Sequence, residues 1–203
     1  MKTKLLTLVL VLVSVSLFAQ GKVGFVNDST RVFVFNQGFM LAADVAYAGQ
    51  PVPTTGLPSG TELYATLYAG TSAGSLTLQT AVLLAGTSIP TPGRMATKNV
   101  ILNGVPVGLG FFQIFVSNNN GFFPATISSA NDFQQSANPF YFGTSGLFTR
   151  TVPSSITYPV IWAPDSTWAS GDVVIYGAPE PSVFALLGIS GAMLVVHRRR
   201  RVE

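Results

Sequence analysis

Glycine and proline interrupt this chain so often that its middle has no room for long helices. The 203 residues include 20 glycines and 13 prolines. Between residues 20 and 178 they separate short runs rich in Val, Ile, Phe and Tyr, with turns about every eight to twelve residues, which is typical of strands. We therefore expect an all-β body, an antiparallel β-sandwich of about eight or more short strands.

The side-chain pattern places the individual strands. Strands are expected at residues 23–27, 31–35, 62–69, 76–84, 96–102, 109–117, 160–163 and 173–176. The first two are expected to form one hairpin, and the third and fourth another. The run 111–116 is the most apolar in the body and predicts a core strand. The segment 39–47 fits either a short helix or a strand, and residues 122–159 predict no clear element.

The first 19 residues have the pattern of a secretory signal peptide. Lys2 and Lys4 form a basic start, residues 5–15 are apolar, and a cleavage site is expected between Ala19 and Gln20. The sequence thus predicts export through the general secretion machinery, with residues 20–178 as one domain.

The last 25 residues read as a motif, an apolar segment and a basic stop. The motif is Pro179, Glu180, Pro181 and Ser182; residues 183–196 carry no charge; and residues 197–201 end in Arg198, Arg199, Arg200 and Arg201. A helix over the apolar segment covers about 21 Å, short of a bilayer core of about 30 Å, but arginine side chains can extend it. We expect a single C-terminal transmembrane helix with the arginines on the cytoplasmic side.

This tail, residues 179–203, resembles the PEP-CTERM sorting signal of Gram-negative bacteria. The resemblance implies recognition by an exosortase, transient anchoring in the inner membrane, and transfer of the body to the cell surface or an extracellular exopolysaccharide or biofilm matrix. The segments 24–27 and 64–70 also look like domains found upstream of such tails in Verrucomicrobia-like bacteria, with no assigned activity. An ordinary tail anchor that is never cut is the alternative.

The charge of the body excludes nucleic acid as a partner. The whole chain has a formal charge of +3, but Lys2, Lys4 and the terminal arginines supply six of its eleven basic residues. The body keeps five basic residues against six acids, a net charge of −1. Capture of nucleic acid needs clustered Lys and Arg, which the body lacks.

The body has few side chains that could carry out catalysis. The chain has no cysteine, and its one histidine, His197, lies in the basic stop. A histidine-dependent nucleophile and the usual His or Cys metal sites therefore cannot be assembled in the body. We expect no enzyme activity, no cofactor and no metal site.

Carbohydrate remains the alternative ligand, for binding or for cleavage. Asp165 and Asp172 flank Trp168, with Trp162 nearby, and aromatic rings beside acids are the composition of a sugar site. The competing interpretation is a Trp-anchored loop that packs on the sandwich. A second group of aromatic residues, at positions 122, 123, 133, 140, 141, 142 and 148, fits either the core or a groove for a polysaccharide or partner. The sequon at Asn27 is interpreted as a turn.

Overall fold

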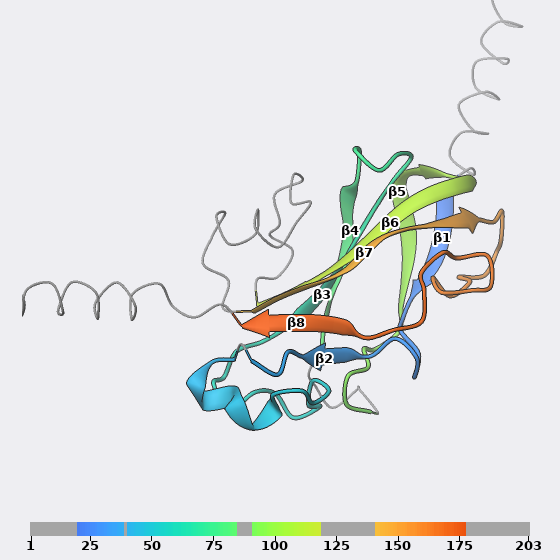
Figure 1. The fold of residues 1–203 in the computed structure, drawn as a ribbon. Coiled ribbons are helices and arrows are strands. Elements are labelled where there is room, and N and C mark those ends of the chain that lie inside the picture. The colour runs from blue at the N-terminus through green and yellow to red at the C-terminus, as the bar shows by residue number, and fades with distance from the viewer. Residues whose placement is uncertain (1–19, 39, 85–90, 119–140, 178–203) are drawn as a thin grey trace, which may run out of the picture.

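The computed structural model describes residues 20–38, 40–84, 91–118 and 141–177. The predicted signal peptide and sorting tail lie outside this part of the chain. The described part is mostly β (Figure 1). Its elements are β1 (Gln20–Phe25), β2 (Phe33–Phe35), the 3₁₀ helix η1 (Ala42–Tyr47), β3 (Tyr64–Gly70), β4 (Thr77–Leu83), β5 (Lys98–Pro106), β6 (Gly108–Ser117), β7 (Tyr141–Val152) and β8 (Val173–Gly177).

The strands form one large and one small sheet. The large sheet has six strands in the order β2-β8-β7-β6-β3-β4, and the small sheet pairs β1 with β5. Every pair is antiparallel except β2 with β8, where Phe33 lies opposite Val173 in a parallel register. The large sheet is therefore mixed, which corrects the expectation of purely antiparallel sheets.

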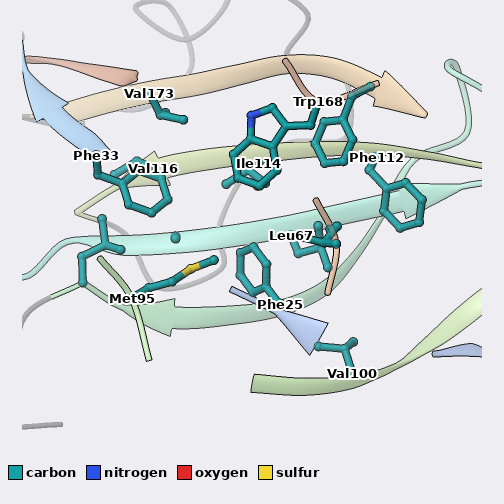
Figure 2. Close-up of a cluster of buried hydrophobic side chains, with 14 of the residues drawn as sticks. Phe25, Phe33, Leu67, Met95, Val100, Phe112, Ile114, Val116, Trp168 and Val173 are labelled. Carbon is teal, nitrogen blue, oxygen red and sulfur yellow. The ribbon is translucent and has the colours of Figure 1, made fainter. Parts of the chain in front are cut away.

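The small sheet lies against one face of the large sheet, and the two share one core. Val23 and Phe25 of β1 and Val100 of β5 belong to the same buried cluster as Leu67 of β3 and Ile114 of β6. Figure 2 shows Phe25, Val100, Leu67 and Ile114 among the buried side chains between the strands. Because a two-stranded sheet alone is only marginally stable in water, this shared core supplies most of what holds β1 and β5 in place.

Strand β6 lies in the middle of the large sheet, paired with β3 on one side and β7 on the other. Its even-numbered residues Phe112, Ile114 and Val116 face the main core. On the opposite face Phe115 belongs to a second buried cluster, with Tyr68 and Phe142. Apolar residues on both faces are the pattern of a strand with both faces covered, and the predicted core strand is confirmed.

The small sheet is connected to the large one along both of its edges. On the β1 side, the Gly24 N–H donates to Pro159 O at 2.9 Å and the Ile161 N–H donates to Gly24 O at 3.0 Å. Arg150 of β7 donates to the carbonyl oxygens of Pro159 and Val160. A buried arginine thus fastens this segment to the large sheet.

On the β5 side, side chains replace backbone pairing. Residues Leu67 and Tyr68 of β3 face Thr80 and Leu78 of β4, so Gln79 is an extra, bulged residue. Its side-chain oxygen accepts the Asn103 N–H at 2.7 Å, and its amide nitrogen donates to Asn103 O at 3.2 Å. Lys98 Nζ donates to Ala81 O at 3.2 Å. The two strand edges thus meet across a seam bridged by side chains.

Several strand predictions are confirmed and others are wrong. The hairpin at 62–84 is present as β3 and β4, and segment 39–47 contains the 3₁₀ helix η1. The hairpin at 23–35 is wrong, because β1 pairs with β5 and β2 pairs with β8. Of residues 160–163, only Val160 pairs, in an isolated bridge with Gly24, and the segment forms no strand. The longest strand, β7, falls in the region for which the sequence predicted no element.

Candidate functional site

The predicted sugar site lies where the turn at 28–31 meets the segment 162–172, and Arg31 organises it. The Arg31 guanidinium carbon lies 5.6 Å from the ring centre of Trp168 and 6.0 Å from that of Trp162. Its Nη2 and Nε donate to the Trp168 carbonyl oxygen at 2.8 and 3.2 Å. The role of Arg31 was not predicted from the sequence, although a cation beside two indoles is a common stabilising arrangement.

Asp28 completes the contacts of Arg31. Its carboxylate lies 2.8 Å from Arg31 Nη1 and also accepts hydrogen bonds from the backbone and hydroxyl of Thr30. Burial alone would raise the pKa of Asp28, but the bonds from Thr30 and the charge of Arg31 outweigh it and lower that pKa. Spacing of i and i+3 between Asp28 and Arg31 was the available sequence signal for this pair.

The two tryptophans differ in what they offer a ligand. Trp168 is only 4% exposed, belongs to the main core and stacks on Phe148 at a centroid distance of 5.2 Å. Its ring therefore packs against other side chains of the protein, in agreement with the interpretation of a Trp-anchored loop. Trp162 is partly buried against the core, and its indole N–H is buried without a hydrogen-bond partner.

The two predicted acids have different surroundings. The Asp165 side chain is 45% exposed, and its carboxylate lies 3.6 Å from Nε of the buried Arg150. Burial lowers the pKa of Arg150, and the nearby charge of Asp165 partly offsets that effect. Asp172 is exposed just before β8 begins. Asp165 thus balances a buried cation.

Asn27 lies next to this cluster and joins two segments that are distant in sequence. Its side-chain nitrogen donates to Arg31 O at 2.7 Å and Gly93 O at 2.8 Å, and its oxygen accepts the Met95 N–H at 2.9 Å. The residue is completely buried. Its amide nitrogen is thus committed inside the fold, so the sequon serves the structure and offers no glycosylation acceptor here.

A second buried polar pair lies at the other end of β8. The Tyr141 hydroxyl donates to the Asp44 carboxylate at 2.6 Å, and the other carboxylate oxygen accepts the Ser59 N–H at 2.9 Å. Both residues are completely buried. Burial, together with the hydrogen bond to Asp44, raises the pKa of Tyr141 well above its usual value of 10.0. The pair holds η1 against the start of β7.

The remaining site predictions have these outcomes. Of the second aromatic group, Tyr141, Phe142 and Phe148 are buried, and the members at positions 122, 123, 133 and 140 lie outside the described residues. The sorting motif, the basic stop and Ala19 also lie outside them, whereas Gln20 begins β1. Within the described ranges, no three His, Cys, Asp or Glu residues gather as a metal site would require.

Comparison with known proteins found no matching family model, curated protein or solved structure. In the part of the chain that the structure describes, no helix is long and apolar enough to span a bilayer.

Proposed function

We propose that this chain is an exported, non-enzymatic β-sandwich protein that a PEP-CTERM-type tail delivers to the cell surface or extracellular matrix. The observation that carries the proposal is the order of residues 179–201: Pro-Glu-Pro-Ser, then fourteen uncharged residues, then His and four arginines. A signal-peptide pattern at the other end supports the same route. In this proposal an exosortase processes the tail at the inner membrane and releases the body.

The roles of the acidic side chains support a body without catalysis. Asp28 is paired with Arg31, Asp44 with Tyr141, and Asp165 with Arg150. Glu62 accepts a hydrogen bond from the hydroxyl of Tyr64. Each of these carboxylates already has a structural partner, whereas a glycosidase needs two carboxyl groups free to flank one bond.

The test is the intact mass of the protein from each cell fraction, in a host with and without its exosortase. The expected product begins near Gln20, ends within residues 179–182, and occurs at the surface or in the medium only when the enzyme is present. A product that keeps Arg201 and remains in the inner membrane in both hosts would contradict sorting. It would instead establish a permanently anchored envelope protein.

Carbohydrate binding is the second candidate. The observation that favours it is the exposed carboxylate of Asp165 and the exposed Asp172 on the segment that carries the partly exposed Trp162. Binding across a polysaccharide array, lost on Trp162→Ala and on Asp165→Asn, would support it. Trp168→Ala is unsuitable because that ring fills the core. An array without any bound glycan would count against this candidate.

A further inference from the structure

The place where the tail leaves the folded body lies beside the helix η1. Gly177, the last residue of β8, is paired with Tyr141 of β7. The Tyr141 hydroxyl donates to Asp44 within η1 and accepts the N–H of Leu41, the residue before η1, at 3.3 Å. Figure 1 shows the cyan η1 close to the arrowhead of β8. Any surface to which the tail leads is therefore also close to η1.

The outer face of η1 carries no charge. Four of its six residues are exposed, and all four are small and apolar: Ala42, Ala43, Val45 and Ala46. Val45 is 64% exposed. The one charged residue of η1, Asp44, is completely buried because its carboxylate points to Tyr141 and Ser59. The fold thus turns the only charge of this helix inward and its apolar side chains outward.

The connection between the body and the apolar tail segment is short. Five residues, 178–182, separate Gly177 from Val183. Fully extended, the six steps from Gly177 to Val183 span at most about 22 Å. The headgroup layer on each side of a bilayer accounts for about 5–8 Å of that distance. Once residues 183–196 enter the hydrocarbon, the end of β8, which lies beside η1, is held within about 17 Å of the headgroups.

We infer that η1 is a lipid-contacting surface, whose alanines and Val45 rest on the membrane interface while the tail is anchored. This inference rests on the proposed function, because it needs the tail in a bilayer. Four small side chains bury too little area to bind lipid alone. The membrane-inserted tail keeps η1 at a high effective concentration beside the lipid surface, which compensates for the low affinity of η1 for lipid. The contact therefore exists before the tail is cut and is lost afterwards. An uncharged face suits the membrane interface, because no charged side chain has to lose its water there.

The test places a fluorescent probe on η1 in the full-length chain. The chain has no cysteine, so Val45→Cys and Ile156→Cys each give one labelling site for an environment-sensitive dye. Ile156 is 94% exposed and lies beyond Val152, the end of the twelve-residue strand β7 that is opposite to Tyr141. Both proteins are reconstituted in vesicles of phosphatidylcholine and phosphatidylglycerol that contain a lipid carrying a headgroup-level quencher.

The expected result is a blue-shifted emission and several-fold stronger quenching at position 45 than at position 156, both abolished in a chain that ends at Gly177. Equal, weak quenching at both positions in protein that floats with the vesicles would overturn the inference and leave the anchor intact. Protein that does not float would overturn the anchor itself, and the inference with it. A shift at position 45 that appears only when exosortase is added would overturn lipid contact in favour of a protein partner.

Discussion

Substitution of Asn27 should lower the stability of the fold by a large amount for a side chain of its size. Asn27→Ala leaves the buried Met95 N–H and the partly buried Arg31 carbonyl oxygen without this partner, whereas the Gly93 oxygen keeps the Phe33 N–H. We expect the free energy of unfolding to fall by about 2–4 kcal/mol, since each unsatisfied buried group costs about 1–3 kcal/mol. Urea denaturation measures the change.

The matched control is Asn36→Ala. The Asn36 side chain accepts one exposed hydrogen bond, from the Gly38 N–H. This substitution should change stability by less than about 0.5 kcal/mol. Equal losses in the two variants would show that Asn27 does not connect the segments as described.

Tyr141 should make stability fall at alkaline pH. Its pKa is raised in the folded protein above the 10.0 of an ordinary tyrosine. The unfolded chain therefore releases this proton first, so the contribution of Tyr141 is complete below about pH 10 and is lost as the pH rises beyond it. Tyr141→Phe should cost about 1.5–3 kcal/mol at neutral pH, because Asp44 loses a donor.

The same variant should also show a flatter stability curve between pH 9 and 11, measured by urea unfolding at each pH. Tyr64 is the control, because its pKa is also raised, through its bond to Glu62, but its hydroxyl is exposed. Tyr64→Phe should therefore leave most of the alkaline slope in place. An unchanged slope in Tyr141→Phe would contradict the assignment.

At the scale of single residues, the sequence predicted which residue types lie in the candidate site better than it predicted which residues they contact. The composition around Trp162, Trp168 and Asp165 suggested a site, and those residues do lie in one region with Arg31 and Arg150. The Trp-anchored loop weighed as the competing interpretation agrees with the burial of Trp168, but the sequence did not indicate its stacking partner Phe148, a residue 20 positions earlier in the chain. The identity of a single residue does not indicate which distant residue it will contact.

At the scale of elements, strand β6 gives the clearest prediction. Ile114 is completely buried in the main core, whereas Leu109 on the same strand is 61% exposed. Ile114→Ala should lower the free energy of unfolding by about 2–5 kcal/mol through lost burial and a cavity. Leu109→Ala should lower it by less than about 0.5 kcal/mol. Chemical denaturation of the two variants would reveal an error in the side-chain register if they proved alike.

Elements were predictable wherever their signal is local. Alternation in residues 62–84 predicted β3 and β4, since their pairing needs only a short turn. The segment 23–35 carries a similar pattern but forms no hairpin. Asn27 binds Gly93 and Met95 there, so the chain passes from the small sheet to the large one instead of folding back. Strand β7 was missed because Gly143, Thr144, Ser145 and Gly146 interrupt its apolar pattern.

At the scale of the whole molecule, the shared core predicts that both sheets unfold together. The small sheet has only two strands, and its buried side chains are part of the main cluster. A dye attached at Asn99→Cys, on the exposed side of β5, should report the same urea midpoint as tryptophan fluorescence and circular dichroism. An earlier transition at the dye would show that β1 and β5 detach independently.

The parallel pairing of β2 and β8 has a consequence for the timing of folding. Phe33 and Val173 are 140 residues apart in the sequence, yet they lie side by side. A ribosome must therefore complete almost the entire body before β2 can find its partner, and contacts of such long range form slowly. If the chain is exported as we propose, it would reach the secretion channel before β2 and β8 can pair. Strand β2 can therefore complete its pairing only after β8, the last strand in the described part of the chain, has been made.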